Sequence, residues 1–221
     1  PLIPAKYGPK KLAGKAVCKA ALQKELGLDE SADTPLIGVI SRLDPQKGFD
    51  LIAEAMETLL SGNVQVALLG TVNPEYHALF EKVAAARPRQ FSANLKFDNG
   101  LAHRIEAGCD MFLMPSRYEP CGLNQLYSLK YGTIPIVRST GGLADSITDA
   151  TPELIKTGDA TGFAFADYTS AALLETVKRA LAVYGKKTEW KKVMQNAMAK
   201  DFSWKSSAHE YVSLFESLVK S

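Results

Sequence analysis

Short apolar runs alternate along the chain with longer stretches in which apolar residues recur at helical spacing. The apolar runs lie at 35–40, 64–70, 94–97, 110–115, 134–138 and 162–166. They are rich in β-branched or aromatic residues and are mostly apolar on both faces, which is typical of strands covered by helices on both sides. The predicted helices lie at 15–26, 49–60, 75–86, 102–108, 123–131, 144–149, 168–184, 189–199 and 206–219.

This alternation of strand and helix through six strands predicts an α/β fold with one doubly wound parallel sheet and right-handed crossovers. We expect residues 1–221 to form a single domain. Ligands of such sheets bind beyond the carboxyl ends of the strands, near the point where the strand order reverses. The loops that lead from a strand into a helix are therefore the places to look for chemistry.

Composition narrows the class of protein without naming it. The chain has 221 residues, of which 46% are apolar and 23% are charged, as in ordinary globular proteins. Its 26 basic residues face 24 acidic ones, a balance too even to predict a nucleic-acid partner. No apolar run approaches the length of a membrane span, and the first residues lack the apolar middle of a signal peptide.

The cysteine content and the first residue add two expectations. The three cysteines have neither metal-binding nor thioredoxin spacing, which predicts a reduced intracellular protein without disulfides. The chain begins with Pro1 rather than methionine, so we expect a fragment or a processed chain.

The loop after the first apolar run, ISRLDPQKGFD, contains two cations. Arg42 and Lys47 follow the strand, and Gly48 allows a tight backbone. A guanidinium fork and an ammonium group at this position predict an anion site, most plausibly for phosphate. The alternative is that both are solvated surface charges.

The next two loops give weaker indications. Gly70 ends the second apolar run and either forms a simple turn or lets a ligand approach the backbone, and no G-x-G-x-x-G or P-loop pattern is present. Phe97 ends the third run and either stacks on a base or lies in the core, the commoner fate of an isolated phenylalanine. None of the three histidines has a second metal ligand at a usual spacing, so we predict no metal.

The loop at 115–123, PSRYEPCGL, combines opposite chemistries. Cys121, Gly122 and Leu123 precede a predicted helix, whose N-terminal N–H groups and positive dipole end suit a phosphate. Glu119 has the wrong charge for that anion and is better suited to accept hydrogen bonds from sugar hydroxyls. One loop would then hold both halves of a sugar phosphate. The alternative is a surface ion pair between Arg117 and Glu119, and we favour a loop-orienting role for Arg117.

A fifth loop, VRSTGGLADSI, places paired glycines before a helix. Thr140, Gly141 and Gly142 follow the strand at 134–138. Such a turn lets a ligand approach the backbone closely, although it is also compatible with a flexible connection.

Taken together, these loops resemble those of bacterial glycogen synthases and plant starch synthases. The resemblance rests on SRLDPQKGFDL, PSRYEPCGLNQLYSLKYGTIPIVRSTGGLADSI and DFSWKSSAHEY, in this order and at the family's spacing. It covers essentially this whole chain but only the C-terminal half of such an enzyme, and the K-x-G-G-L motif of the N-terminal half is absent. The resemblance implies a Rossmann-like domain of the GT-B glycosyltransferase architecture. It implies that 204–221 returns to the N-terminal domain.

The resemblance also implies a function and roles for the loop residues. The domain would bind ADP-glucose, without a cofactor or metal, for transfer of glucose to an α-1,4-glucan with retention. Arg42 and Lys47 would hold the diphosphate, Glu119 would bind glucose hydroxyls, and Phe97 would lie beside the adenine. Backbone at 121–123 and 140–142 would line the phosphate and glucosyl region. The protein would work in the bacterial cytoplasm or the plastid stroma.

The sequence departs from the family pattern at two positions, and two alternative functions stay open. A second glutamate that many retaining GT-B enzymes carry is replaced here by Tyr127, and Asn124 stands where threonine is common. A related transferase that uses UDP-glucose and a stand-alone nucleotide-sugar-binding module both stay open. The missing glycine fingerprint disfavours a dehydrogenase.

Overall fold

A computed structural model describes residues 2–71 and 73–219. Its six strands form one sheet in the order β3-β2-β1-β4-β5-β6, and all neighbouring pairs are parallel. The strands are β1 (Leu36–Arg42), β2 (Gln65–Thr71), β3 (Phe91–Asn94), β4 (Met111–Met114), β5 (Ile134–Arg138) and β6 (Phe163–Phe165). The predicted α/β architecture with a parallel sheet is confirmed.

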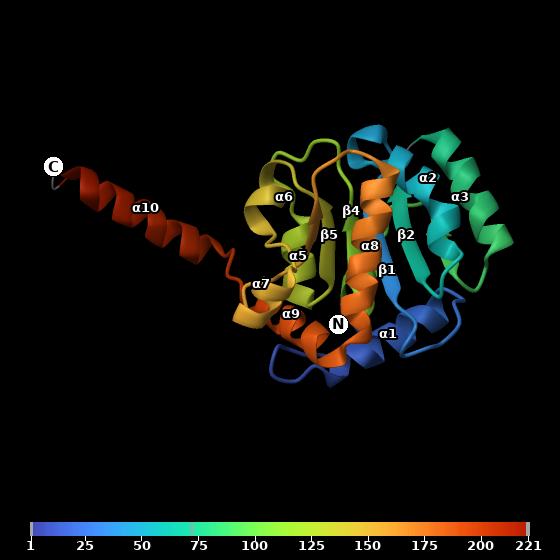
Figure 1. The fold of residues 1–221 in the computed structure, drawn as a ribbon, viewed down its shortest axis with the longest axis horizontal. Coiled ribbons are helices and arrows are strands. Elements are labelled where there is room, and N and C mark those ends of the chain that lie inside the picture. The colour runs from blue at the N-terminus through green and yellow to red at the C-terminus, as the bar shows by residue number, and fades with distance from the viewer. Residues whose placement is uncertain (1, 72, 220–221) are drawn as a thin grey trace.

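Helices connect successive strands and cover the sheet (Figure 1). The helices are α1 (Ala13–Glu25), α2 (Phe49–Leu60), α3 (Pro74–Ala86), α4 (Asn99–Gly108), α5 (Asn124–Tyr131), α6 (Gly141–Ser146), α7 (Pro152–Thr157), α8 (Ser170–Gly185), α9 (Lys187–Ala199) and α10 (Trp204–Val219). A short 3-10 turn, η1 (Pro45–Lys47), precedes α2.

The sheet has a buried layer on each face because its strand residues alternate between the two. On β2, Val66 and Leu68 belong to a core shared with α2 and α8, whereas Ala67 and Leu69 belong to a core shared with α1 and α4. Figure 1 shows α8 crossing in front of the central strands. This double coverage explains why the strands read as nearly continuous apolar runs.

The strand order reverses beside β1. From β1 the chain proceeds through β2 to β3 on one side, and the later strands β4, β5 and β6 extend the sheet on the other. The loops that follow β1 and β4 therefore diverge at the carboxyl edge of two adjacent strands, which is where open α/β sheets bind ligands.

The predicted third strand is wrong by three residues. The structure places β3 at Phe91–Asn94 instead of 94–97, because Phe91 is buried, stands opposite Val66 on β2 and packs its ring 5.9 Å from that of Phe80. The following helix also begins earlier than predicted, since the Asp98 side chain accepts a hydrogen bond from Leu101 N–H and caps α4. Phe97 is consequently a loop residue rather than the end of a strand.

Two short elements were not predicted, and one predicted helix is displaced. The turn η1 and helix α7 each have proline in their first turn and a polar side chain at the N-cap, Asp44 and Thr151 respectively. Both are too short to show helical periodicity. The helix predicted at 144–149 instead begins with the paired glycines, at Gly141.

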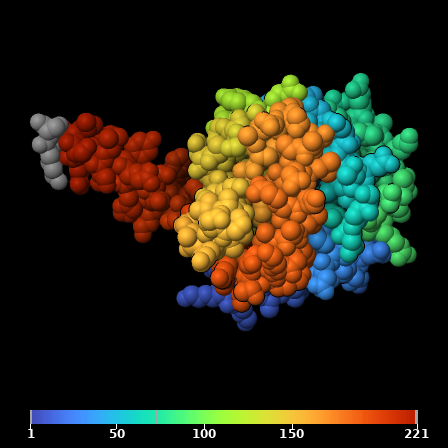
Figure 2. All heavy atoms as spheres, viewed as in Figure 1, coloured from blue at the N-terminus to red at the C-terminus, as the bar shows by residue number. Residues whose placement is uncertain are grey.

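The last helix stands apart from the sheet and its covering layers (Figures 1 and 2). None of the residues of α10 is buried, and its exposed apolar side chains include Tyr211, Phe215 and Leu218. Within residues 2–71 and 73–219, no helix combines the length and the apolar content that crossing a membrane requires.

Candidate functional site

A cavity of about 130 Å³ opens at the carboxyl ends of β1 and β4. The loop after β1 contributes Lys47 to its lining, and the loop after β4 contributes Ser116, Glu119, Gly122 and Leu123. These loops are separated by some seventy positions in the sequence, and the adjacency of β1 and β4 brings them together. The structure thus unites two of the predicted loops in one hollow.

Lys47 and Glu119 face each other across this hollow. The Lys47 Nζ lies 2.7 Å from Glu119 Oε2, and the side chains are 20% and 8% exposed. Ser116 Oγ donates a second hydrogen bond to the same carboxylate oxygen at 3.3 Å. The predicted alternative of an ion pair between Arg117 and Glu119 is wrong, because Lys47 is the partner of Glu119.

A second cavity of about 240 Å³ adjoins the first. Its lining includes Arg42, Gly70 and Phe97, and it shares Ile40, Ser41 and Asn124 with the first cavity. The Arg42 guanidinium is 62% exposed and lies 3.6 Å from Asp44 Oδ2. An arginine, a glycine backbone and an exposed aromatic ring therefore meet in one hollow beside the Lys47 cavity.

Phe97 and Gly70 contribute to that hollow in different ways. Phe97 is 88% exposed, so its ring is not a core residue and is open to a planar ligand. At Gly70 a β-carbon would lie 2.2 Å from Ser41 O and 2.8 Å from a Leu43 methyl group. The glycine is thus required by the packing of β2 against the end of β1, which is a structural reason independent of any ligand.

The two glycine loops predicted to line a phosphate lie against each other. Gly142 N–H donates to Glu119 O at 3.0 Å and to Pro120 O at 3.2 Å, and a β-carbon on Gly141 would lie 2.2 Å from Glu119 O. Thr140 is the N-cap residue of α6. The N–H of Gly142 is therefore already used to hold the loop of Glu119, whereas Gly122 and Leu123 line the first cavity.

Arg117 points away from Glu119 and towards the rim of the site. Its guanidinium lies 4.6 Å from the centre of the Tyr168 ring and 3.1 Å from Asp50 Oδ2. The Tyr168 hydroxyl in turn donates to Asp50 Oδ1 at 2.5 Å and contacts Pro45 O at 3.1 Å. Burial, together with the Asp50 carboxylate, raises the pKa of Tyr168. Arg117 and Tyr168 thus join the loops of Lys47 and Glu119 from outside the cavities, as a loop-orienting role requires.

Three further polar residues line the cavities without having been predicted as site residues. Ser41 and Ser116 each lie at or just after a strand end, and Asn124 Nδ2 donates to Ile40 O at 2.9 Å. The sequence could have indicated the two serines, since polar residues at or directly after the end of a core strand face the carboxyl edge of the sheet.

Tyr127, in the place of the second glutamate, is 52% exposed and does not line either cavity. No three histidine, cysteine, aspartate or glutamate side chains converge as metal ligands within 2–71 and 73–219.

Fold and cavities together define a Rossmann-like α/β domain with polar cavities at its switch point. The sequence profile of the family described as "Glycosyl transferases group 1" matches residues 23–197. The chain belongs to this family.

Individual relatives agree with this assignment. A glycogen synthase of Anaeromyxobacter dehalogenans (strain 2CP-C) is 51% identical over 219 residues, which is 99% of this chain and 45% of that protein. The catalytic domain of starch synthase IV from Arabidopsis thaliana, solved with ADP and acarbose bound, superimposes with a TM-score of 0.89 at 38% identity and covers 100% of this chain and 46% of that one. The chain therefore spans less than half the length of these relatives.

A second solved structure corresponds more closely to this chain in length. The C-terminal domain of the group 1 glycosyl transferase LpcC from Francisella tularensis has a TM-score of 0.63 at 17% identity, covering 81% of this chain and 89% of that one. This likeness concerns the fold alone. It agrees with the predicted Rossmann-like parallel sheet.

Proposed function

We propose that this chain is the donor-binding domain of a retaining glucosyltransferase that transfers glucose from ADP-glucose to the non-reducing end of an α-1,4-glucan. The observation that carries the proposal is the pair of adjoining cavities, one with Lys47 and Glu119 and one with Arg42 and Phe97. They occur in a fold that matches an ADP-bound starch synthase over the whole chain. The glycogen synthase relatives support the same activity.

The roles of the residues follow from their charges and exposure. The exposed face of Phe97 would stack on the adenine, and Arg42 and Lys47 would contact the diphosphate. Glu119 would accept hydrogen bonds from glucose hydroxyls, and the backbone at 121–123 and 140–142 would line the phosphate and glucosyl region. Lys47 would exchange its contact with Glu119 for one with a phosphate oxygen, which would release the carboxylate for the sugar.

The chemistry benefits from this placement of charge. Glycosyl transfer builds negative charge on the leaving diphosphate and positive character on the sugar. Fixed cations and amide N–H groups beside the diphosphate stabilise the transition state more than the ground state. In the metal-free reaction that we propose, Arg42 and Lys47 supply this stabilisation, while the carboxylate of Glu119 lies on the sugar side.

The proposal includes partners that this chain does not contain. An N-terminal domain of the same enzyme would face the cavities and contribute to binding the glucan. The exposed apolar side chains of α10 would pack on that domain, which would explain why a helix with Phe215 and Leu218 has no covering layer here. We propose that such an enzyme works in the bacterial cytoplasm or the plastid stroma.

Calorimetric titration with nucleotides tests the donor assignment. We expect the protein to bind ADP and ADP-glucose more tightly than UDP and UDP-glucose. A preference for the uridine compounds would replace the assignment by a UDP-glucose transferase. Glucan extension is measured in parallel, and we expect it from the full natural protein but not from residues 1–221 alone. Extension by the isolated domain would contradict the two-domain proposal.

A further inference from the structure

Gln125 lies buried directly beneath the loop that lines the first cavity. Its side chain belongs to the first turn of α5, and the residue is 1% exposed. The Nε2 atom lies 2.9 Å from Cys121 O, 3.2 Å from Gly122 O and 3.3 Å from Ser146 Oγ. Because two of these neighbours are carbonyl oxygens, only the NH₂ end of the amide is compatible with this side.

The two carbonyl contacts fix the direction of two peptide N–H groups. The Cys121 carbonyl and the Gly122 N–H belong to one peptide unit, and the Gly122 carbonyl and the Leu123 N–H belong to the next. No peptide in the described chain is cis, so the C=O and N–H of each unit point in opposite directions. The N–H groups of Gly122 and Leu123 therefore point away from Gln125.

These N–H groups are available to a ligand. Gly122 and Leu123 line the first cavity, whereas Gln125 does not. Across residues 2–71 and 73–219, neither N–H donates to a protein acceptor. The two peptide units between Cys121 and Leu123 thus have a buried amide on their carbonyl side, and the two residues that carry their N–H groups line the open cavity.

Gln125 also connects this loop with the other glycine loop. Ser146, the last residue of α6, contacts Gln125 Nε2 and donates from its Oγ to Gly142 O at 2.5 Å. Gly142 in turn donates to Glu119 O. A continuous set of hydrogen bonds therefore runs from Gln125 through Ser146 and Gly142 to the backbone of Glu119.

The other end of the amide shows that packing alone does not explain this residue. Gln125 Oε1 is buried and has no hydrogen-bond partner in the described part of the chain. A buried acceptor without a donor is destabilising, so an apolar side chain of similar size would remove an unfavourable group. What such a side chain could not do is hold the two carbonyls.

We propose that Gln125 is a positioning residue that orients the Gly122 and Leu123 N–H groups towards the diphosphate of the donor. The inference rests on the proposed function and extends it to a residue that does not itself line the cavity. Loss of the amide would leave both peptide units free to rotate, and the N–H groups would no longer be fixed towards the anion before it binds. Affinity for the phosphate part of the ligand would fall, while affinity for the nucleoside part would not.

The test compares Gln125→Met with the parent in the full natural protein that contains this chain. Methionine keeps the size of the side chain and removes its hydrogen bonds. We expect ADP to bind about 10-fold to 100-fold more weakly by calorimetry, the range for lost hydrogen bonds to a charged group. Adenosine, measured by competition, should bind with unchanged affinity. Gln195→Met is the matched control, because Gln195 lies on α9, outside the lining of both cavities, and in the described part of the chain its side chain donates to Pro9 O.

A second variant, Gln125→Glu, gives a signature that a purely structural role would not produce. A protonated carboxyl can still donate one hydrogen bond to a carbonyl, whereas a carboxylate repels both. We therefore expect the ADP affinity of this variant, relative to the parent, to fall as the pH rises. The Gln125→Met defect should not change with pH.

Three outcomes would overturn the inference. In the first, Gln125→Met binds ADP as the parent does, which leaves the proposed function intact. In the second, the affinities for ADP and adenosine fall equally and the melting temperature drops, which would make Gln125 a packing residue. In the third, the parent itself does not bind ADP, which would remove the proposed function and this inference together.

Discussion

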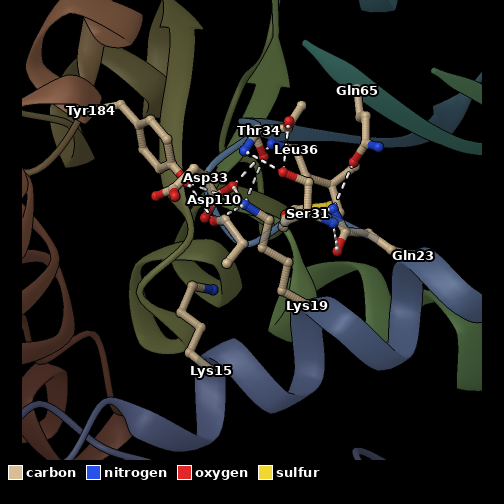
Figure 3. A network of polar contacts seen from close by, with 12 residues as sticks. Lys15, Lys19, Gln23, Ser31, Asp33, Thr34, Leu36, Gln65, Asp110 and Tyr184 are labelled. Atoms are coloured by element: carbon tan, nitrogen blue, oxygen red, sulfur yellow. Dashed lines mark hydrogen bonds and ion pairs between the residues drawn. The ribbon is translucent and has the colours of Figure 1, made fainter. Parts of the chain in front are cut away.

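Two lysine–carboxylate pairs of equal length lie at opposite edges of the sheet. Lys19 and Asp110 are 2.7 Å apart at the edge where the strands begin, and Lys47 and Glu119 are 2.7 Å apart at the edge where they end. Lys19 Nζ also donates to Ala32 O. It further contacts Thr34 O and the Tyr184 hydroxyl, two residues that Figure 3 shows around it. Asp110 additionally accepts from Leu36 N–H at 2.9 Å. In the described chain, the only hydrogen bond of Lys47 Nζ is the one to Glu119.

This difference separates a structural ion pair from one that a ligand can rearrange. The Lys19 side chain is 6% exposed, and its ammonium group has three N–H donors but four oxygen acceptors within hydrogen-bond distance. No donor is therefore left for a further partner. Lys47 borders a cavity and has two hydrogens to spare. The distance within an ion pair therefore says little about its role, whereas the number of other partners and the adjoining space say much.

The largest expected effect is on the buried pair. Lys19→Met would leave the Asp110 carboxylate buried without its cation, which destabilises a protein by about 3–5 kcal/mol. Urea denaturation followed by circular dichroism measures this loss. Lys187→Met is the control, because Lys187 is 59% exposed and pairs with an exposed Asp33, so a change below about 1 kcal/mol is expected. Similar values for the two variants would show that the Lys19–Asp110 pair stabilises the protein no more than an exposed ion pair does.

Lys47→Met should show the opposite behaviour. Without Lys47 the diphosphate loses one charge-assisted hydrogen bond, for which about 1.5–3 kcal/mol of binding free energy is typical, or roughly 10-fold to 150-fold in affinity. Calorimetric titration with ADP measures the effect. The urea midpoint should shift less than for Lys19→Met, because the Glu119 carboxylate lines an open cavity and keeps its hydrogen bond from Ser116. Unchanged ADP affinity would identify Lys47 as a surface residue.

A smaller effect concerns the pH dependence of stability. Burial raises the pKa of Glu106 to about 8, although a hydrogen bond from Ser128 and the charge of Lys15 act in the other direction. The folded state then holds a proton that the unfolded chain releases above its ordinary pKa near 4.5, so stability falls as the pH rises from about 5 to 8. Between pH 5.5 and 7.5 the loss should be about 2.5 kcal/mol, given about 1.4 kcal/mol per pH unit for one proton.

Glu106→Gln separates this contribution from the rest of the molecule. Glutamine cannot ionise, so urea midpoints of the variant at pH 5.5 and 7.5 should differ less than those of the parent. Burial also lowers the pKa of Lys15 to about 8, and because its unfolded value is higher, that group makes stability rise only above pH 8. A parent whose stability does not fall between pH 5.5 and 7.5 would contradict the prediction.

The smallest effect is expected at Phe97. Replacing this exposed ring by alanine should weaken ADP binding by about 0.5–1.5 kcal/mol, the range for one aromatic pair, and should leave the urea midpoint unchanged. Leu79→Ala removes another exposed apolar side chain outside both cavities and serves as the control. Equal ADP affinities for the two variants would exclude stacking on Phe97.

The sequence predicted those features that depend on local pattern. Five of the six strands overlap their predicted ranges closely, because double coverage makes each one a continuous apolar run. The third strand was misplaced because both FSAN and NLKF fit a strand, and only the contact of Phe91 with Phe80 decides between them. Helix α7 went unnoticed because two turns are too few to show a period.

The candidate site likewise has residues that local pattern predicts and contacts that it does not. Lys47 and Glu119 were predicted separately, each from its position after a strand, and their proximity depends on β1 lying beside β4. The link between Gln125 and the carbonyls of Cys121 and Gly122 could not be predicted, because a glutamine in the first turn of a helix is ordinary. A hydrogen bond from a helix side chain to the carbonyls of the preceding loop leaves no pattern in a sequence, so this link is evident only in the structure.

The loop between β4 and α5 also contains a site for a spectroscopic probe. The chain has three cysteines, and Cys18 and Cys109 are buried whereas Cys121 is exposed. A thiol-reactive fluorophore would therefore label residues 1–221 in their folded state at a single position, next to Gly122, without any substitution. Emission from that dye would report occupancy of the first cavity in real time, and protection of Cys121 from labelling would reveal a ligand too weak for calorimetry.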